Sequence, residues 1–352
     1  MQYTMREQLG ISAEHLCACL QEHYHLIPAA LDFLPLGLDY RAGVYRIVSE
    51  QGASYLLKVR SGTLYEPGCL VPAYLSDQGI TSVVAPLPTR NHALWARRED
   101  WTVIVYPFLE GETSWRGMTD EQWKETGSIF KQIHQVAPPS SGFESLRKET
   151  FDPTGYAQWI RIFETQHLHA SSGESTSRQA LRSSWIENQA TIHAVVASLE
   201  QLAVVLHRRN LPYVICHADL HPANLLRDRT GRVFVIDWDE VMLAPKERDF
   251  LFIKESPTDS ETLPGTPAFF QGYGQADLDW IALTYYRYER VIQDVIACAE
   301  NVCLRDDLGE ESRADEAQLF QDVLAEGGEI DAATQASAHL SPDLTIPIRR
   351  NA

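Results

Sequence analysis

Positive charge, paired cysteines and long apolar runs are all scarce in this chain of 352 residues. It has 30 Lys and Arg against 48 Asp and Glu, which gives a formal net charge of −18. Such a charge opposes non-specific binding to nucleic acid or to an anionic membrane. It is compatible with a cationic partner, although an acidic surface also serves solubility alone. We therefore expect neither nucleic acid nor membrane among the partners.

The 6 cysteines are scattered, with no CxxC pair and no dense framework of the kind found in small secreted domains. We interpret them as reduced core thiols. The first residues, MQYTMREQLG, lack a basic segment followed by an apolar run, and nowhere do about 18 apolar residues run together as a membrane span requires. We expect a soluble, cytoplasmic protein, and 44% hydrophobic residues suffice for a sizeable core.

The first third of the chain changes from helical to strand periodicity. Apolar residues recur at helical spacing near its start, and short apolar runs separated by Gly-rich and polar connections follow. The expected elements are a helix at Ala13–Tyr24, a helical stretch around Ala73–Ser76, and strands at 33–37, 44–49, 54–60, 93–96 and 101–106. We predict a small N-terminal lobe, residues 1–107, with a five-stranded antiparallel sheet and a helix.

The remainder is mostly helical in its periodicity. Helices are expected at Asp120–His134, Tyr156–Leu168, Trp185–Arg208 and Leu278–Glu300. Between the last two lies a β insert, PYVICHADLHPANLLRDRTGRVFVIDWD, in which Asp228–Gly231 suits a hairpin turn. We predict a larger C-terminal lobe over 108–340 and a flexible tail over 341–352, and so a bilobal α+β fold. The polar stretches 171–177 and 306–316 are not expected to contribute to the core.

The β insert carries the chemistry. Phosphoryl transfer needs a carboxylate near the attacking hydroxyl, oxygen ligands for Mg²⁺ and cations around the phosphates. Asp219 can orient the hydroxyl and accept its proton. Asn224, five residues on, offers an amide oxygen, and Asp237 at the end of an apolar run offers a carboxylate, both suited to Mg²⁺.

Two other interpretations of the insert are weaker. An Asp in a loop is usually a turn former, but here an Asn, a hairpin and a strand ending in Asp follow at fixed places. His217 and His221 could indicate a transition-metal site, yet no third ligand lies at a recognisable spacing.

His217-Ala-Asp219-Leu-His221-Pro-Ala-Asn224, followed by Ile236-Asp237-Trp238-Asp239, resembles the catalytic segments of the aminoglycoside phosphotransferase and choline kinase family, distant relatives of protein kinases. The resemblance extends from Lys58 to about Asp294. It implies a protein-kinase-like fold, Mg²⁺ held by Asn224 and Asp237, and ATP or GTP as co-substrate. It further implies that His217 braces the catalytic loop and that Asp249 supports the backbone of that loop.

The resemblance also implies a nucleotide site in the N-terminal lobe. Lys58 matches the lysine that contacts nucleotide phosphates, and Glu66 is the nearest candidate for its partner, although Pro67 and Pro72 argue against a regular helix there. A solvated Glu66 is an equal alternative. The loop Leu36–Gly43, with Gly37 and Gly43, would cover the phosphates. The segment Val105–Leu109, including Tyr106 and Phe108, would present backbone groups to the purine base.

The acceptor is expected to be small. Only seven residues separate Asp237 from Pro245, so no peptide-docking segment fits between them. The runs IDWDEVMLAPKERDF and YYRYERVIQD look closest to the spectinomycin phosphotransferases, which phosphorylate the hydroxyl of the antibiotic at position 9. Spectinomycin carries two amines that are cationic at neutral pH, and carboxylates would attract them.

Five residues are candidates for the acceptor cleft: Asp239, Glu240, Tyr286, Glu289 and Asp294. On the late helix, a solvated polar face at Glu289 is a competing interpretation. His134, alone on a mostly apolar helix, is interpreted as a packed core residue. The rival functions are a kinase of choline, homoserine or another aminoglycoside, and a nucleotide-binding pseudokinase. We expect a monomer or a weak dimer.

Overall fold

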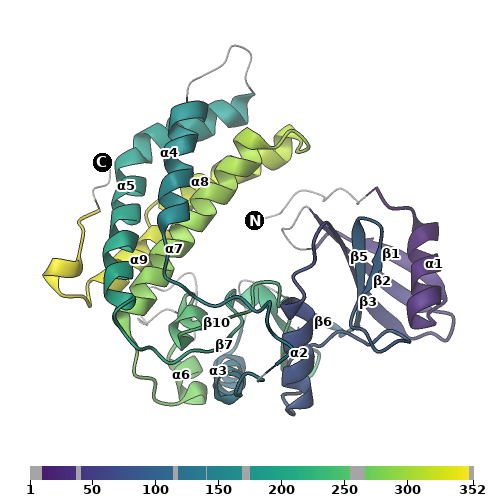
Figure 1. Cartoon of the computed structure of the whole chain (residues 1–352). Coiled ribbons are helices and arrows are strands. Elements are labelled where there is room, and N and C mark those ends of the chain that lie inside the picture. The colour runs from purple at the N-terminus through teal and green to yellow at the C-terminus, as the bar shows by residue number, and fades with distance from the viewer. Residues whose placement is uncertain are drawn as a thin grey trace. The chain divides into compact units, whose positions relative to one another are not determined.

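The computed structural model describes residues 10–36, 41–113, 118–139, 141–168, 175–253 and 266–348 (Figure 1). The chain divides into two compact units. The sheet unit holds the described residues of Met5–Lys148 and Tyr213–Ala276, and the helical unit holds those of Glu149–Pro212 and of the chain from Asp277 onward. The sheet unit thus contains both the N-terminal sheet and the β insert. The division into lobes at residue 107 follows a different line and stays a prediction.

One antiparallel sheet of the sheet unit has the strand order β1-β2-β3-β5-β4. Its strands are β1 (Pro28–Leu34), β2 (Ala42–Ser49), β3 (Ser54–Ser61), β4 (Ala96–Arg98) and β5 (Trp101–Pro107). Successive side chains of a strand point to opposite faces, and Leu57 and Val59 of β3 are fully buried in the core beneath helix α1 (Ala13–Tyr24). Lys58, between them, therefore lies on the other face. The predicted five-stranded sheet is confirmed.

Two strands are displaced from their predicted positions. β1 ends at Leu34, whereas the prediction placed a strand at 33–37. β4 begins at Ala96, where the prediction for 93–96 ended, and its charged residues Arg97 and Arg98 pair with β5. Charged side chains are common on edge strands, where they discourage further pairing, and here they concealed the apolar pattern.

Helix α2 (Pro67–Asp77) is longer than the predicted stretch Ala73–Ser76, and the argument against a regular helix here is wrong. Pro67 occupies the first helical position, where its missing N–H costs no hydrogen bond. Pro72 lies inside the helix and removes one bond of the ladder. Glu66 stands at the N-cap, immediately before the helix.

The β insert forms two small sheets. One has the order β6-β8-β9, from β6 (Gly111–Glu112), β8 (Leu225–Asp228) and β9 (Val233–Val235), and the other pairs β7 (Val214–Cys216) with β10 (Met242–Ala244). The predicted turn is confirmed: the Gly231 N–H donates to the Asp228 carbonyl at 2.9 Å, and Gly231 has a φ of 87°. One 3-10 turn, η1 (Pro222–Asn224), lies inside the insert, and a second, η2 (Lys246–Phe250), follows it.

The connection that follows helix α3 (Asp120–Gln135) is attached to β10 at its end, through Arg147 and Lys148. The Leu243 N–H donates to the Arg147 carbonyl at 2.8 Å, and Lys148 forms a parallel bridge with Leu243. The Lys148 ammonium lies 4.9 Å from the ring centroid of Tyr213. The places where the chain leaves the sheet unit after Lys148 and re-enters it at Tyr213 are therefore side by side.

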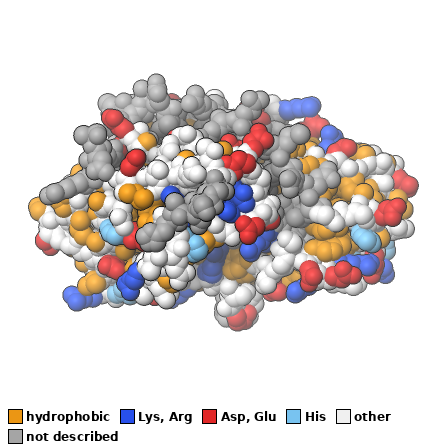
Figure 2. Space-filling view, turned by 90° about the horizontal axis from the view of Figure 1, so that it is seen from above, with side chains coloured by type: hydrophobic (Ala, Val, Ile, Leu, Met, Phe, Trp, Pro, Cys, Tyr) orange, Lys and Arg blue, Asp and Glu red, His pale blue; other side chains and the backbone are white. Residues whose placement is uncertain are grey.

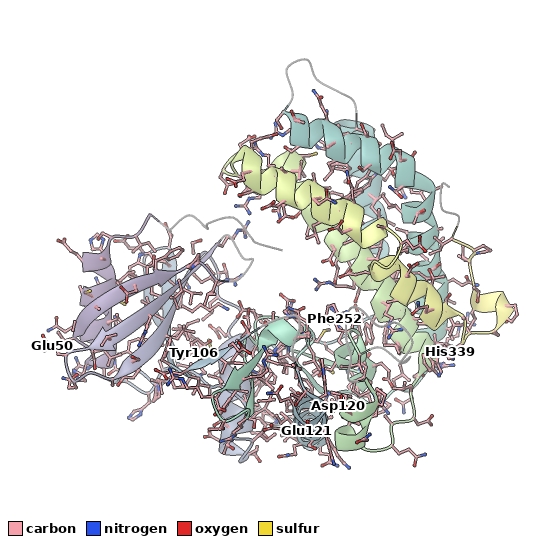
Figure 3. All side chains as sticks on the ribbon, turned by 180° about the vertical axis from the view of Figure 1, so that it is seen from behind. Glu50, Tyr106, Asp120, Glu121, Phe252 and His339 are labelled. Atoms are coloured by element: carbon pink, nitrogen blue, oxygen red, sulfur yellow. The ribbon has the colours of Figure 1, made fainter. Side chains whose placement is uncertain are left out.

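Helices α3 (Asp120–Gln135) and α6 (Thr266–Tyr273) cross at two glycines of the sheet unit. A Cβ built on Gly127 would lie 2.0 Å from the Phe269 carbonyl oxygen, and one on Gly272 would lie 1.8 Å from that of Lys124. Only glycine permits this approach. The helix α3 begins with Asp120 and Glu121, whose negative charges interact favourably with the positive N-terminal end of the helix dipole (Figure 3).

The helical unit consists of α4 (Thr154–His167), α5 (Thr176–Leu206), α7 (Trp280–Ala299), α8 (Glu310–Leu324) and α9 (Glu329–Ser337), with a π-helical turn η3 (Glu300–Leu304) after α7. Helix α7 contacts α4, α5, α8 and α9. On its first residue, the ring of Trp280 stacks on His339 with centroids 3.7 Å apart (Figure 3). The three helices predicted at 156–168, 185–208 and 278–300 are confirmed, although α5 begins nine residues early.

Helix α5 is long and apolar enough to cross a membrane by length and composition, and it is the one such helix among the described residues. Of its most apolar stretch of 18 residues, 44% is buried. Trp185, Ile192 and Leu199 of the same helix are fully buried. A core helix of a soluble protein passes the same test. On the face shown in Figure 2, apolar side chains are scattered among polar and charged ones where the described residues are visible.

The polar stretch 306–316 and the start of the predicted tail take a larger part in the structure than predicted. Within 306–316, Leu308 is buried and the acidic residues from Glu310 onward form the first half of α8, whose later residue Phe320 is fully buried. The stretch 171–177 lies largely outside the described residues. The predicted tail begins with a 3-10 turn, η4 (Pro342–Leu344), and the Gln201 amide of α5 donates to the Asp343 carbonyl. The flexibility of the last residues stays a prediction.

Candidate active site

A loop between β7 and η1 carries Asp219, and Asp249 of η2 holds the backbone of that loop. The Asp249 carboxylate is fully buried and accepts from the N–H groups of His217 at 3.1 Å and Ala218 at 2.7 Å. Ala218 has a φ of 69°, a left-handed conformation that non-glycine residues rarely adopt. The two hydrogen bonds stabilise this strained turn and thereby fix the direction in which Asp219 projects.

The imidazole of His217 links the loop to the end of the β8–β9 hairpin. Its Nε2 lies 2.9 Å from the Ile236 carbonyl oxygen, and its Nδ1 accepts from the Asp219 N–H at 3.3 Å. Since a carbonyl only accepts, Nε2 carries the proton and Nδ1 is the acceptor, which is the pattern of a neutral imidazole. The ring is fully buried, and it fixes Asp219 relative to the residue before Asp237.

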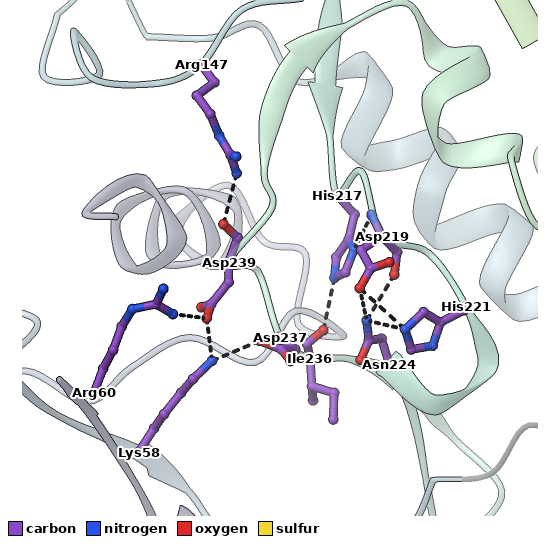
Figure 4. A network of polar contacts seen from close by, with 10 residues as sticks. All are labelled: Lys58, Arg60, Arg147, His217, Asp219, His221, Asn224, Ile236, Asp237 and Asp239. Atoms are coloured by element: carbon purple, nitrogen blue, oxygen red, sulfur yellow. Dashed lines mark hydrogen bonds and ion pairs between the residues drawn. The ribbon is translucent and has the colours of Figure 1, made fainter. Parts of the chain in front are cut away.

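Asp219, His221 and Asn224 form one hydrogen-bonded group (Figure 4). The Asn224 amide nitrogen donates to the Asp219 carbonyl oxygen at 2.9 Å and to its carboxylate Oδ2 at 3.2 Å. The His221 Nε2 lies 3.3 Å from the same Oδ2. Because the nitrogen of the amide is used inside the group, its oxygen is the atom that remains for a metal ion.

Asp237 follows β9 in a left-handed conformation with a φ of 61°. Its Oδ1 lies 2.9 Å from the Lys58 ammonium, which comes from β3. The positive charge of Lys58 lowers the pKa of the Asp237 carboxyl from its ordinary value, and this outweighs the effect of burial. Lys58 and Asp237, 179 positions apart in sequence, are thus brought into contact within the sheet unit.

Lys58 meets a second carboxylate, that of Asp239, at 2.8 Å. Burial alone would lower the pKa of the Lys58 ammonium, but the carboxylates of Asp237 and Asp239 raise it above its usual range. Arg60 lies 3.1 Å from the same Asp239 oxygen (Figure 4). The Asp239 carboxylate thus binds the two cations of β3, and its predicted place in the acceptor cleft stays a prediction.

Two residues that were not predicted from sequence, Arg147 and Tyr65, hold the segment that follows Asp237. The Arg147 guanidinium donates to the Asp239 carbonyl at 3.0 Å and pairs with the Glu240 carboxylate at 3.0 Å. It lies 4.3 Å from the ring centroid of Tyr65, whose hydroxyl donates to the Val241 carbonyl at 2.8 Å. These contacts join residues far apart in sequence, so no local pattern indicated them.

Three other residues were predicted for the nucleotide site: Glu66, Gly43 and Gly37. Glu66 precedes α2, and the carboxylates that pair with Lys58 are those of Asp237 and Asp239. Gly43 lies inside β2, opposite Val59, and not in a loop. Gly37 lies outside the described residues. These positions leave the predicted roles of the three residues as predictions.

Tyr106 and Phe108 lie at the end of β5 and just beyond it. Tyr106 is in register with Leu56, and burial raises the pKa of its hydroxyl well above the ordinary value (Figure 3). The Arg46 guanidinium of β2 lies 4.7 Å from the ring centroid of Phe108.

The three late-helix candidates lie on α7 in the helical unit, and they differ in their surroundings. Tyr286 is fully buried, with its ring centroid 5.8 Å from that of Phe151. Glu289 is buried and accepts from the Tyr156 hydroxyl at 3.1 Å, which argues against a solvated face at this position. Asp294 accepts from Arg290 at 2.8 Å, one helical turn away.

His134 was interpreted as a packed core residue, and both nitrogens of its ring are in addition at hydrogen-bond distance from polar partners. Its Nε2 lies 2.8 Å from Asp249 Oδ2 and its Nδ1 lies 2.8 Å from the Tyr273 hydroxyl. With Cys216 it belongs to the one cluster of potential metal ligands among the described residues. The imidazole nitrogens and the Asp249 oxygens already have hydrogen-bond partners, so the cluster supports the loop.

The side chains fit a magnesium-bound nucleoside triphosphate. An amide oxygen at Asn224 and a carboxylate at Asp237 are hard oxygen donors of the kind that Mg²⁺ binds. Lys58 is a cation held beside that carboxylate, as contact with a metal-bound phosphate requires. Asp219, 24% exposed, remains open to a second reactant.

The sheet with helix α2, together with the insert that carries Asp219 and Asp237, defines a kinase of the protein-kinase-like fold. The sequence profile described as the phosphotransferase enzyme family matches residues 32–289, and the chain belongs to this family. It is a phosphotransferase with an alcohol group as acceptor. The family resemblance, the bilobal α+β fold and the enzyme class predicted from sequence are confirmed.

Three relatives illustrate the similarity. The crystal structure of spectinomycin phosphotransferase APH(9)-Ia in complex with ADP and spectinomycin is 29% identical, with a TM-score of 0.82 over 94% of this chain and 99% of that chain. Protein StrN of Streptomyces griseus is 27% identical over 228 residues, which cover 62% of this chain and 68% of StrN. Amicoumacin kinase hAmiN, in complex with AMP-PNP, Ca²⁺ and Ami, shares the fold at 18% identity and a TM-score of 0.61, covering 91% of this chain and 95% of that chain.

Proposed function

We propose that this protein transfers the γ-phosphate of ATP or GTP to a hydroxyl of spectinomycin, and so inactivates the antibiotic in the cytoplasm. The observation that carries the proposal is the similarity to spectinomycin phosphotransferase APH(9)-Ia along nearly the whole of both chains. Relatives below 25% identity, such as the choline kinases, share only the fold, so we favour no second acceptor.

In this proposal Asp219 is the group at the acceptor hydroxyl. Its backbone is fixed by His217 and its carboxylate by Asn224, so it can hold the hydroxyl in line for attack and accept the proton. Asn224 and Asp237 would hold Mg²⁺, which when bound neutralises charge on the phosphates. Lys58 would bind phosphate oxygens in exchange for part of its present contact with carboxylates.

Electrostatics favours a cationic acceptor. The net charge of −18 raises the local concentration of a dication around the protein and opposes binding of nucleic acid. Within the sheet unit, Glu240 is 56% exposed and close in sequence to Asp237, and we assign it to the acceptor side. Tyr286, Glu289 and Asp294 remain our candidates on the helical unit. We expect the enzyme to act as a monomer or a weak dimer.

A coupled assay of ADP or GDP release tests the proposal. Spectinomycin, other aminoglycosides, choline and homoserine are compared as acceptors, each with ATP and with GTP, and the product is identified by mass spectrometry. We expect release that depends on spectinomycin and a phosphorylated product. If ADP or GDP is released only with another amine, that amine is the acceptor and spectinomycin is not. Nucleotide binding without any turnover would indicate a pseudokinase.

A further inference from the structure

β3 presents two cations on the same face of the sheet. Lys58 and Arg60 are two residues apart, so their side chains project to the same side, about 7 Å apart along the strand. Val59, between them, is fully buried on the opposite face. In the register of the sheet, Lys58 lies opposite Val44 and Ile104, and Arg60 lies opposite Ala42 and Thr102, nearer the start of β2.

The two cations converge on one oxygen. Asp239 Oδ2 lies 2.8 Å from Lys58 Nζ and 3.1 Å from Arg60 Nη1 (Figure 4). Lys58 also binds Asp237, so the four side chains form one ionic chain across 181 positions of sequence. An oxygen that receives two cations occupies a place suited to a phosphate oxygen, because guanidinium and ammonium groups bind both kinds of anion.

The group is also accessible. The side chains of Lys58, Arg60 and Asp239 are 14%, 24% and 31% exposed, so a ligand can reach them and exchange with the carboxylate. The exchange replaces one anion by another, so the two cations keep an anionic partner throughout. The Arg147 guanidinium donates to the Asp239 carbonyl at 3.0 Å, and this bond holds the Asp239 backbone when its side chain is released.

We propose that Arg60 is a second phosphate-binding residue, which exchanges Asp239 for the phosphate groups of the nucleotide beyond the α-phosphate. The inference rests on the proposed nucleotide-dependent function. Tyr106, in the segment proposed to bind the base, lies opposite Leu56 of β3. Along β3, Arg60 is therefore farther from that segment than Lys58 is, and it serves a phosphate farther from the base. Arg60 thus binds and positions the phosphate chain and takes no part in proton transfer.

Isothermal titration with AMP, ADP and the non-hydrolysable analogue AMP-PNP, each with Mg²⁺, tests this assignment without turnover. For Arg60→Gln we expect the Kd of AMP to change less than about 2-fold and the Kd values of ADP and AMP-PNP to rise by about 10-fold or more, since a hydrogen bond between charged groups is lost. Arg60→Lys should recover part of the lost affinity. Arg97→Gln, at an exposed arginine of β4 in the same sheet, is the control for loss of one charge.

Two results would overturn the inference. One is an Arg60→Gln protein that binds all three nucleotides as the wild type does, and the other is an equal loss for AMP, ADP and AMP-PNP, which would indicate general damage. The Arg60→Lys variant keeps the charge and guards against misfolding of the Gln variant. A wild-type protein that binds no nucleotide would overturn the proposed function, and this inference with it.

Discussion

Asp249 illustrates how a single buried side chain supports the site. Its carboxylate accepts from two consecutive backbone N–H groups of the catalytic loop and pairs with His134. The loop conformation at Ala218 is unfavourable by itself. Its stability therefore depends on a residue about 30 positions away, which acts on Asp219 only through the backbone.

Replacing Asp249 with Ala should lower the free energy of unfolding by about 3 kcal/mol or more, because buried donors lose their acceptor at about 1–3 kcal/mol each. Urea denaturation measures the change. Asp77→Ala, at an exposed position at the end of α2, is the matched control. An Asp249→Ala protein as stable as that control would show that the catalytic loop keeps its conformation without the Asp249 carboxylate.

Asp219→Ala should lower turnover by at least about 10² while nucleotide affinity stays within about 2-fold, since a positioned base acts mainly in the transition state. Steady-state kinetics and titration with ADP separate the two effects. Wild-type turnover in the variant would remove Asp219 from its assigned role, and Asp77→Ala again serves as control.

The Lys58–Asp237 pair should give a stability term that is lost in acid. The folded-state pKa of Asp237 is lowered from 3.8, so the unfolded chain binds more protons near that value, and the stabilisation is complete above it and lost as pH falls through the folded-state value. The pKa of Lys58 is raised from 10.5, so its side of the pair is complete at all pH values below that.

Accordingly, Lys58→Met should be less stable than the wild type by a constant amount between about pH 5 and 9, and this difference should shrink below about pH 4. Urea denaturation across this range measures it. A difference that grows in acid would contradict the assigned direction of the Asp237 shift.

At the residue scale, the sequence predicted side chains whose partners are close in the chain or fixed by a motif. Asp219 and Asn224 are five positions apart and do meet. Arg60 and Arg147 were missed because their partners, Asp239 and Glu240, become neighbours only after folding. Lone arginines on a strand or in a loop carry no periodic signal.

At the element scale, the glycine crossing of α3 and α6 should tolerate no side chain. Gly127→Ala would place a methyl group against the Phe269 carbonyl, and overpacking of this kind costs about 1–3 kcal/mol. Gly155→Ala in α4 meets nothing within 4 Å and should be neutral or stabilising by up to about 1 kcal/mol. Thermal unfolding of both variants makes the comparison, and equal melting temperatures would refute it.

Elements were predicted well where their periodicity was strong. The helix α3 was found nearly to its ends, whereas the first turns of α5 were missed because Thr176–Ser184 is largely polar. The helix α6 is short and glycine-containing, and tertiary contact with α3 stabilises it more than its own propensity does. Strand β10 has three residues, too few to show alternation, and depends on pairing with β7.

At the scale of the whole molecule, excess negative charge should affect encounter with a cationic acceptor. Between about 0.05 and 0.5 M salt we expect the KM for spectinomycin to rise a few-fold with little change in kcat, because screening weakens attraction over about 10 Å. Sucrose at matched osmolality is the control. A KM independent of salt would show that only contacts inside the site select the acceptor.

The fold as a whole could be predicted because its catalytic motif and its change of periodicity agree. The helical unit could not be predicted in the same detail, since packing among α7, α8 and α9 is set by shapes of side chains and not by a motif. The candidate acceptor residues on α7 depend on that packing, and only their positions on one helix were indicated by the sequence.

The neighbouring positions of Lys148 and Tyr213 have a practical meaning for engineering. The chain leaves the sheet unit after Lys148 and returns to it at Tyr213. These two residues are in contact, and Lys148 forms a bridge with Leu243 of β10. This excursion cannot be exchanged by itself, because its helix α5 packs against α7 and α8. A graft that alters acceptor preference would have to replace these helices together, while Asp219, Asn224 and Asp237 keep their scaffold in the sheet unit.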